Sequence, residues 1–365
     1  MIDEKIKILL FIPNLSAGGA ERVMLFIAKN LNKNKFHAKL VIIGSPKDTF
    51  YETKEVEIIY LNRSNVKKAI IPIFKLFKIF KPNIVLGSLT HVNYIIAFVS
   101  IFFPKITCVA RETFVISVGE KFNDWNKKPF HRINNLISKI AHKRIDYFIC
   151  QSNDMKNDMM NNFKYKNKKI ITINNPVSED IKTKTSILKN EIIQFITVGR
   201  LVEQKGYERI INVLSTLDIA FNYTIIGNGK EEGKILSLAK KLNVFDKITH
   251  IPRTNKVYEL LAKSHVYLMG SYLEGFPNAL IESLAVGTPA IVYEAPGGMN
   301  EIIKNDENGY LVKNDIEFRE RILFIVENIN SFNPKNVSEH VKSSFGARSI
   351  IEKYETLFFE INEKV

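Results

Sequence analysis

The strongest constraint on the fold is an alternation of short apolar runs with segments of helical spacing, which continues along the chain. In the first half, runs with the length and composition of buried strands occupy residues 5–13, 38–44, 84–89, 106–110 and 147–150. In the second half, similar runs occupy residues 193–198, 223–226, 248–251, 266–269, 290–293 and 310–312. Strands that alternate with helices in this way predict an α/β fold with doubly wound parallel sheets.

The chain is long enough for two domains, because its 365 residues exceed what one hydrophobic core usually fills. A polar stretch at 178–190 has the composition of a connection between domains. We therefore expect a first Rossmann-like domain over residues 1–177 and a second over residues 190–345. In the final segment, 346–365, apolar residues recur at helical spacing and predict a closing helix.

The start of the sequence and its longest apolar stretch favour a protein of the cytoplasm. Asp3 and Glu4 run straight into the first apolar run, which is the wrong order for a secretory signal. The uncharged stretch 84–104 is long enough to suggest a membrane span, but polar residues interrupt its centre. We interpret this stretch as a strand, a polar loop and a buried helix.

Cysteine usage gives no sign of a metal site. The sequence has two cysteines, Cys108 and Cys150, and each lies inside an apolar run. This placement supports neither a disulfide framework nor a zinc site, so we interpret both as buried structural thiols. No paired-carboxylate metal motif stands out either, and the sequence predicts no metal ion and no other cofactor.

The net charge of +14 belongs entirely to the first half of the chain. Residues 1–180 contain 29 Lys and Arg against 15 Asp and Glu, whereas residues 181–365 contain 23 of each kind. A basic excess on one half suggests a polyanionic partner, which could be an anionic membrane or a nucleic acid. No recognised nucleic-acid-binding motif occurs, so we expect no nucleic-acid partner.

The most informative motif runs from Gly270 to Pro289 and reads GSYLEGFPNALIESLAVGTP. Pro277 suits the first position of a helix, so the unpaired amides of the next residues would point to the end of the preceding strand, where a diphosphate can bind. The segment resembles the GT-B glycosyltransferases of family 4 type that carry two glutamates separated by seven residues. The resemblance implies two Rossmann-like domains that face across a cleft.

The same resemblance implies how this segment would bind the nucleotide sugar. Glu274 would face the donor sugar, and Glu282 would accept hydrogen bonds from the ribose hydroxyls. The remaining donor-binding residues would contribute mainly backbone groups, and they are Gly275, Phe276, Pro277, Asn278, Ala279 and Leu280.

A second segment, VGRLVEQKG at residues 198–206, lies between a predicted strand and a predicted helix. It resembles the diphosphate-binding segment of the same family, which implies that Arg200 and Lys205 bind the donor diphosphate. Negative charge builds on the diphosphate as the glycosidic bond breaks, and fixed cations in a dry cleft stabilise that charge without a metal. We therefore expect both residues to assist departure of the leaving group.

Two glycine turns add candidates for donor binding. The turn after the predicted strand 223–226 and the strand end near residue 252 line the nucleobase pocket in similar proteins, which implies roles for Asn228, Gly229 and Arg253. Gly18 and Gly19 resemble the loop by which the first domain closes over the donor phosphates. A dinucleotide fingerprint would need three spaced glycines, and its absence argues against an NAD-dependent dehydrogenase.

Polar residues follow two strands of the first domain. His91 comes after the predicted strand 84–89, where this family often places a polar side chain against the donor sugar, and Thr90 is the alternative occupant. A single histidine beside an apolar helix can equally be a structural residue. Arg111 and Glu112 follow the next strand, at an edge where the acceptor is expected to enter.

Two basic segments, 63–81 and 121–144, contain most of the positive excess and combine cations with large apolar residues. Lys68, Lys75 and Lys78 lie beside phenylalanines in the first segment, and Trp125 lies in the second. Such a mixture suits shallow insertion at a charged membrane surface. Ordinary helices that cover a sheet with their lysine stems are the alternative.

These observations lead to one functional prediction with two alternatives. We expect a retaining glycosyltransferase that transfers a sugar from a nucleotide-diphosphate donor, with UDP expected, to a lipid-linked or surface-glycan acceptor in polysaccharide biosynthesis. Its second partner would be the anionic inner face of the plasma membrane. A UDP-sugar epimerase of the same fold would bind the same donor without a membrane-bound acceptor. A nucleic-acid-binding protein would leave the two-glutamate segment unexplained.

Overall fold

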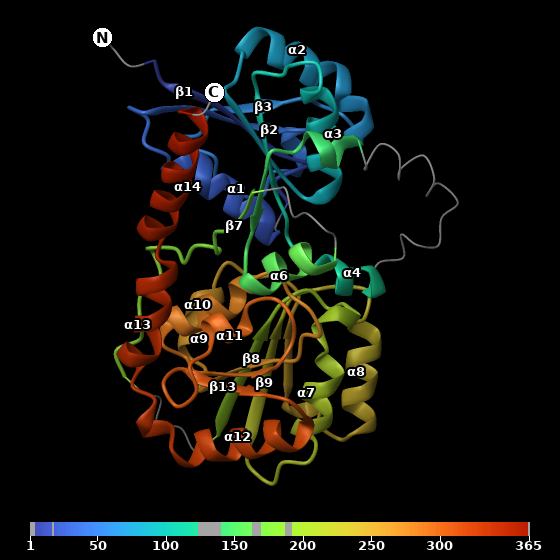
Figure 1. Cartoon of the computed structure of the whole chain (residues 1–365). Helices are drawn as coiled ribbons and strands as arrows, with labels where there is room; N and C mark the ends of the chain where they lie inside the picture. Colours follow the sequence, from blue (N-terminus) through green and yellow to red (C-terminus); the bar gives the residue numbers. More distant parts are fainter. Residues whose placement is uncertain (1–3, 17, 123–139, 163–168, 187–191, 364–365) are drawn as a thin grey trace. The chain divides into compact units, whose positions relative to one another are not determined.

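The structure is a computed structural model that describes residues 4–16, 18–122, 140–162, 169–186 and 192–363. The chain forms two compact α/β units, which are seen in Figure 1. Unit 1 comprises Met1–Thr113, Asn123–Asn175 and Arg348–Val365, and unit 2 comprises Phe114–Phe122 and Pro176–Ala347. Neither unit is therefore a continuous stretch of sequence.

Unit 1 is built on a parallel sheet that has, within the described residues, seven strands in the order β3-β2-β1-β4-β5-β6-β7. The strands are β1 (Ile6–Ile12), β2 (Phe36–Ile42), β3 (Ile58–Tyr60), β4 (Ile84–Ser88), β5 (Thr107–Arg111), β6 (Tyr147–Cys150) and β7 (Lys169–Thr172). Strands β4, β5 and β6 are buried along their whole length, as expected for a parallel sheet covered on both faces.

Helices cover both faces of this sheet. Helix α1 (Gly19–Asn30) and the C-terminal helix α14 (Ala347–Asn362) share one apolar cluster with β1, β2 and β4. On the opposite face, Phe11 of β1 meets Phe77 of α2 (Ile70–Phe80), which packs against α3 (Thr90–Ser100). Helix α6 (Asn153–Asn162) follows β6.

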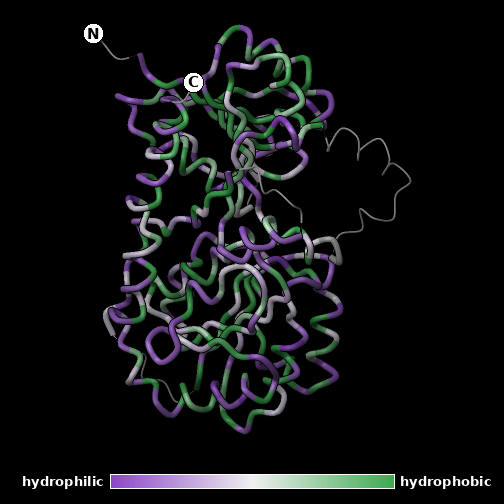
Figure 2. Tube along the Cα trace, viewed as in Figure 1, coloured by the Kyte–Doolittle hydropathy of each residue, from purple (hydrophilic) through white to green (hydrophobic). Residues whose placement is uncertain are grey.

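Unit 2 is built on a second parallel sheet, for which the described residues give the order β10-β9-β8-β11-β12-β13. The strands are β8 (Ile193–Val198), β9 (Phe221–Ile226), β10 (Ile248–Ile251), β11 (Val266–Met269), β12 (Ala290–Tyr293) and β13 (Gly309–Val312). Figure 2 shows mainly hydrophobic residues along the strands of both sheets and many hydrophilic residues in the surrounding helices.

The helices of unit 2 follow from right-handed crossovers that run outward from the middle of the sheet. Helices α7 (Tyr207–Leu214), α8 (Glu232–Lys241) and α12 (Asp315–Glu327) pack in a row, and α10 (Asn278–Val286) packs between α9 (Val257–Ala262) and α13 (Pro334–Phe345). The remaining helices of this unit are short and comprise α4 (Ile116–Phe122) and α11 (Met299–Ile302).

The α/β fold class with two doubly wound sheets is confirmed. Five predicted strands, 147–150, 193–198, 248–251, 266–269 and 290–293, coincide with β6, β8, β10, β11 and β12. Strands β3 and β7 are additional to the prediction. The predicted polar loop after residue 89 is wrong, because α3 begins at Thr90 directly after Leu89, whose φ is 77°.

The predictions for apolar segments can also be compared with the structure. Cys108 and Cys150 are both buried, as expected, and neither forms a disulfide. Within the described part of the chain, no helix is both long and apolar enough to span a bilayer. Residues 123–139, which include Trp125 and most of the second basic segment, lie outside the described residues.

Candidate active site

The strand order of unit 2 reverses between β8 and β11, which are parallel neighbours in the sheet. From β8 the chain continues to β9 on one side, and from β11 it continues to β12 on the other side. Ligands of open α/β sheets bind at such a point, beyond the carboxyl ends of the strands. The loop after β8 carries Arg200 and Lys205, and the loop after β11 carries Glu274. The topology therefore brings together residues that are far apart in the sequence.

Lys205 and Glu274 form an ion pair in which Nζ lies 2.5 Å from Oε1. The Ser271 hydroxyl donates a second hydrogen bond, of 2.7 Å, to the same carboxylate oxygen. The side chains of Lys205 and Glu274 are 22% and 9% exposed. A charged pair with so little solvent contact has strong electrostatic interactions and a fixed geometry.

Main-chain contacts hold the two loops together. Gln204 accepts a hydrogen bond from the amide of Tyr272 and donates one from Nε2 to the carbonyl of Leu273. Gly206 has φ 57°, and a Cβ atom on it would lie 2.0 Å from the carbonyl oxygen of Gly270. Only glycine fits a left-handed position in such close contact with another backbone. The close approach of the two loops therefore requires glycine at position 206.

Arg200 differs from Lys205 in having a free side chain. It is exposed, and within the described residues its guanidinium makes no ion pair or hydrogen bond. Arg200, Lys205 and Glu274 together carry one net positive charge. An exposed guanidinium on the same loop as a paired ammonium suits the binding of an anion such as a diphosphate.

Helix α10 begins one residue later than predicted. Pro277 is its N-cap residue, and Asn278 is the first helical residue. Leu280 is buried, and Glu282 is 7% exposed and has partners within the chain. Helix α10 follows the carboxyl end of β11 through the loop 270–277, and the binding of a diphosphate by the amides of its first turn stays a prediction.

The two residues predicted to bind the nucleobase through the turn after β9 have different surroundings. Asn228 is exposed, and its carbonyl accepts a hydrogen bond of 2.8 Å from the amide of Leu201. A Cβ atom on Gly229 would lie 2.2 Å from the carbonyl oxygen of Leu201. Both residues therefore support the loop that carries Arg200 and Lys205. Arg253 is exposed at the end of β10.

The predicted glycine loop of unit 1 lies at the corresponding reversal of its own sheet, between β1 and β4. Gly18 is the N-cap residue of α1, and its carbonyl accepts a hydrogen bond of 2.9 Å from the Tyr51 hydroxyl. Gly19 is exposed. The roles of both glycines toward the donor stay predictions.

Thr90 and His91 have different surroundings at the start of α3. The Thr90 hydroxyl donates a hydrogen bond of 3.0 Å to the Glu112 carboxylate. His91 is half-buried, and burial lowers its pKa, which favours the neutral imidazole. Which of the two side chains contacts the donor sugar stays a prediction.

The expectation that Arg111 and Glu112 lie where an acceptor enters is wrong, because both are buried. Arg111 has no exposed surface and donates hydrogen bonds to the Tyr354 hydroxyl and the Asn175 side chain. Glu112 is 2% exposed and also accepts a hydrogen bond from Asn93, and burial raises its pKa. Their sequence position at a strand end did not reveal that neighbouring strands and α14 cover them.

Comparisons with known proteins agree with this geometry. The model described as "Glycosyltransferase Family 4" matches residues 17–181, and the model described as "Glycosyl transferases group 1" matches residues 178–337. Together the two models span most of both units. The chain belongs to the GT-B glycosyltransferases of family 4 type.

Relatives of this glycosyltransferase include proteins of similar length. An uncharacterized glycosyltransferase of Haemophilus influenzae is 28% identical over 364 residues, which cover 95% of this chain and 98% of that protein. A Campylobacter jejuni enzyme is 29% identical over 328 residues, covering 85% of this chain and 87% of its own. Its name describes transfer of N-acetylgalactosamine to a saccharide on diphospho-undecaprenol.

The fold of this glycosyltransferase also matches solved structures. Alr3699/HepE of Anabaena, crystallised with UDP and glucose, aligns with a TM-score of 0.79 over 96% of this chain and 99% of that protein. The sequences are 15% identical, so the likeness concerns the fold. The family models, together with relatives such as the Campylobacter enzyme, support an enzyme of glycan biosynthesis.

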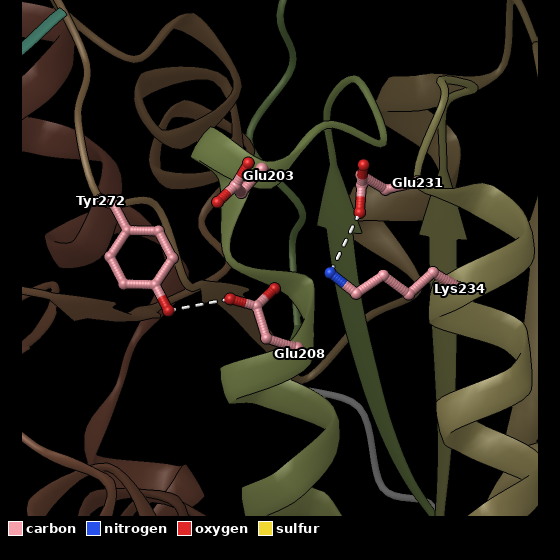
Figure 3. Close-up of a pocket in the computed structure, with 5 residues that line it drawn as sticks. All are labelled: Glu203, Glu208, Glu231, Lys234 and Tyr272. Carbon is pink, nitrogen blue, oxygen red and sulfur yellow. Dashed lines mark hydrogen bonds and ion pairs between the residues drawn. The ribbon is translucent and has the colours of Figure 1, made fainter. Parts of the chain in front are cut away.

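A cavity near this site has the wrong charge for the donor of a glycosyltransferase. The cavity, of about 320 Å³, is lined by Glu203, Glu208, Glu231, Lys234 and Tyr272 and is drawn in Figure 3. Glu208 accepts a hydrogen bond of 2.8 Å from the Tyr272 hydroxyl, and Glu231 pairs with Lys234 at 3.4 Å. Three carboxylates with one lysine would repel a diphosphate.

Two parts of the glycosyltransferase site were missed by sequence reasoning. Ser271, which binds the Glu274 carboxylate, was within the motif but received no role. Gly297 has φ 125°, and a Cβ atom there would lie 2.2 Å from the carbonyl oxygen of Glu274. The pair Gly297-Gly298 after a predicted strand was the available signal, since adjacent glycines indicate a special backbone conformation.

Proposed function

We propose that this glycosyltransferase retains the anomeric configuration of a UDP-sugar donor and requires no metal ion. The observation that carries the proposal is the ion pair of Lys205 with Glu274 at the strand reversal of unit 2, where the loop of Lys205 also carries the exposed Arg200. The two cations, Arg200 and Lys205, suit the binding of a diphosphate, and the fixed carboxylate of Glu274 suits the binding of sugar hydroxyls.

In the proposed reaction, the bond between the sugar and the diphosphate breaks, and UDP departs with the bonding electron pair. Arg200 and Lys205 stabilise the charge that develops on the diphosphate. The acceptor hydroxyl attacks the same face of the sugar and transfers its proton to the departing phosphate. Glu274 holds the donor sugar, and Glu282 binds the ribose. No side chain is assigned as the general base.

In this proposal, cationic side chains of the chain take the place of a metal ion. Arg200 and Lys205 can supply the positive charge that a divalent cation supplies to a diphosphate elsewhere.

Consumption of a UDP-sugar is expected to continue in excess chelator. The assay measures UDP release from a panel of UDP-sugars with a lipid-linked acceptor, with and without EDTA, and with added Mg²⁺ as a control. Full loss of turnover in EDTA, restored by Mg²⁺, would contradict metal independence. Conversion of the sugar to its epimer without an acceptor would identify the epimerase alternative instead.

A lipid-linked acceptor and the inner face of the plasma membrane are the second part of the proposal. The Campylobacter relative acts on a diphospho-undecaprenol substrate. In unit 1, Ile71 and Ile79 of α2 are 69% and 81% exposed, and Lys75 and Lys78 of the same helix are also exposed. Exposed apolar residues between lysines suit shallow insertion into an anionic membrane.

Changing Lys75 and Lys78 to Gln is expected to weaken sedimentation with anionic liposomes. Each lysine near such a surface contributes about 1 kcal/mol, so the partition coefficient should fall roughly 30-fold at low salt. Binding by wild type should also weaken as salt is added.

The matched control replaces Lys33 and Lys353, which are exposed lysines of unit 1 outside α2, with Gln. Equal losses in both double variants would indicate a general effect of charge. A wild-type protein that ignores anionic liposomes at low salt would rule out membrane association through α2.

A further inference from the structure

Unit 1 contains a polar cavity of about 420 Å³ at the carboxyl ends of β1, β2 and β3. This volume lies within the range of about 300–1,000 Å³ that is typical of ligand pockets. Its polar wall consists of Asn14, Ser45, Asn62, Arg63, Ser64 and Asn65. Hydroxyls, amides and a guanidinium are groups that bind the hydroxyls and anionic groups of saccharides.

Arg63 gives the cavity a positive charge. Among the described residues that line it, none is Asp or Glu. Within the same part of the chain, the Arg63 guanidinium forms no ion pair and donates no hydrogen bond. The nearby Lys68 donates a hydrogen bond of 3.3 Å from Nζ to the Ser64 hydroxyl, which adds a second cation at the rim.

The backbone around Arg63 is fixed by neighbouring segments. The amide of Arg63 donates to the carbonyl of Ile43 at 2.8 Å, and the amide of Asn62 donates to that of Gly44 at 3.1 Å. Asn62 has φ 52°, a left-handed conformation that non-glycine residues adopt rarely. The backbone of the segment after β3 is thus held in one conformation, and the exposed guanidinium that it carries has no partner within the described residues, which leaves it available to an anion.

We propose that this cavity binds an anionic group of the acceptor, with the Arg63 guanidinium paired to a phosphate or a carboxylate. The inference rests on the proposed glycosyltransferase function and specifies the substrate class of unit 1. A guanidinium binds both groups through two parallel hydrogen bonds, and the surrounding amides and hydroxyls bind the sugar to which the group is attached. A neutral glycan would leave Arg63 without a partner.

The experiment measures binding of two anions by titration calorimetry after the donor site has been saturated with UDP. Inorganic pyrophosphate represents the phosphates of a lipid carrier, methyl glucuronide represents an acidic sugar, and methyl glucoside is the neutral control. Variants are Arg63→Gln and Arg63→Lys. The matched control is Lys105→Gln, an exposed cation just before the amino end of β5.

Wild type is expected to bind pyrophosphate or methyl glucuronide more tightly than methyl glucoside. Arg63→Gln should weaken that binding at least about tenfold, Arg63→Lys should keep part of it, and Lys105→Gln should leave it unchanged. Binding of pyrophosphate would indicate the phosphates of a lipid carrier as the anionic group of the acceptor, and binding of methyl glucuronide would indicate an acidic sugar. The inference fails if neither anion binds wild type, or if Arg63→Gln and Lys105→Gln behave alike.

UDP binding separates this inference from the proposed function. Arg63→Gln should bind UDP as wild type does, because Arg200, Lys205 and Glu282, which are assigned to the nucleotide, lie in unit 2. If UDP binds while both anions fail, the acceptor inference is overturned and the donor assignment stands. If UDP itself fails to bind wild type, the proposed function is overturned.

Discussion

Replacing Lys205 with Met is expected to lower kcat by about 100- to 1,000-fold, because it removes one fixed cation that stabilises the departing diphosphate. The value of kcat/KM should fall to a similar degree if the contact matters mainly in the transition state. Lys205→Arg should recover part of the loss, since it keeps a charge near Glu274. Initial rates with a UDP-sugar donor measure both constants.

The same change also removes the partner of a nearly buried carboxylate. Lys205→Met leaves Glu274 with the Ser271 hydroxyl and without its ion pair. Thermal unfolding must therefore be recorded, because a lost buried charge partner can destabilise unit 2. The control is Lys263→Met, an exposed lysine after α9. A Lys205→Met enzyme with normal kcat and an intact fold would remove Lys205 from the mechanism.

Replacing Gly206 with Ala is expected to destabilise unit 2 by about 3 kcal/mol or more. Its φ of 57° is unfavourable for alanine, and the new Cβ atom would be 2.0 Å from the carbonyl oxygen of Gly270. For a unit of this size, the loss corresponds to a decrease in Tm of about 6–12 °C. Activity should fall as well, because the loop that carries Lys205 has to move.

Gly233 offers a matched control for this substitution. It lies in α8, and a Cβ atom there would meet nothing within 4 Å. Gly233→Ala should stabilise the protein by up to about 1 kcal/mol, because glycine is unfavourable in a helix. If the contact at Gly206 causes the destabilisation, calorimetry should show a lower Tm for Gly206→Ala and a higher Tm for Gly233→Ala than for wild type. Similar stabilities for the two variants would mean that the two loops adjust freely.

The sequence predicted the α/β fold well because buried parallel strands are continuous apolar runs bounded by polar segments. Strand β3 was missed because it spans only Ile58–Tyr60 and all three residues are half-buried, so no apolar run stands out. Helix α14 was expected from its spacing, but its packing on the sheet of unit 1 was not. Periodicity identifies an apolar face without identifying its partner.

The candidate site was predicted at the level of residues and missed at the level of contacts. The motif at 270–289 predicted a role for Glu274, and the segment at 198–206 predicted one for Lys205. Their ion pair joins side chains 69 residues apart in the sequence, which spacing alone cannot predict. Gly229 was predicted to line the base pocket, and the structure shows it packed against Leu201. A glycine in a turn indicates close approach without telling what approaches.

The discontinuity of unit 1 affects the order in which the chain can fold during synthesis. Ile350, Tyr354 and Phe358 of α14 have no exposed surface and complete an apolar cluster with β1, β2 and α1. Domains usually fold in the order in which they leave the ribosome. Here the residues of unit 2, which end at Ala347, are all made before that cluster can close. A nascent chain must therefore keep one apolar face of unit 1 uncovered until α14 emerges.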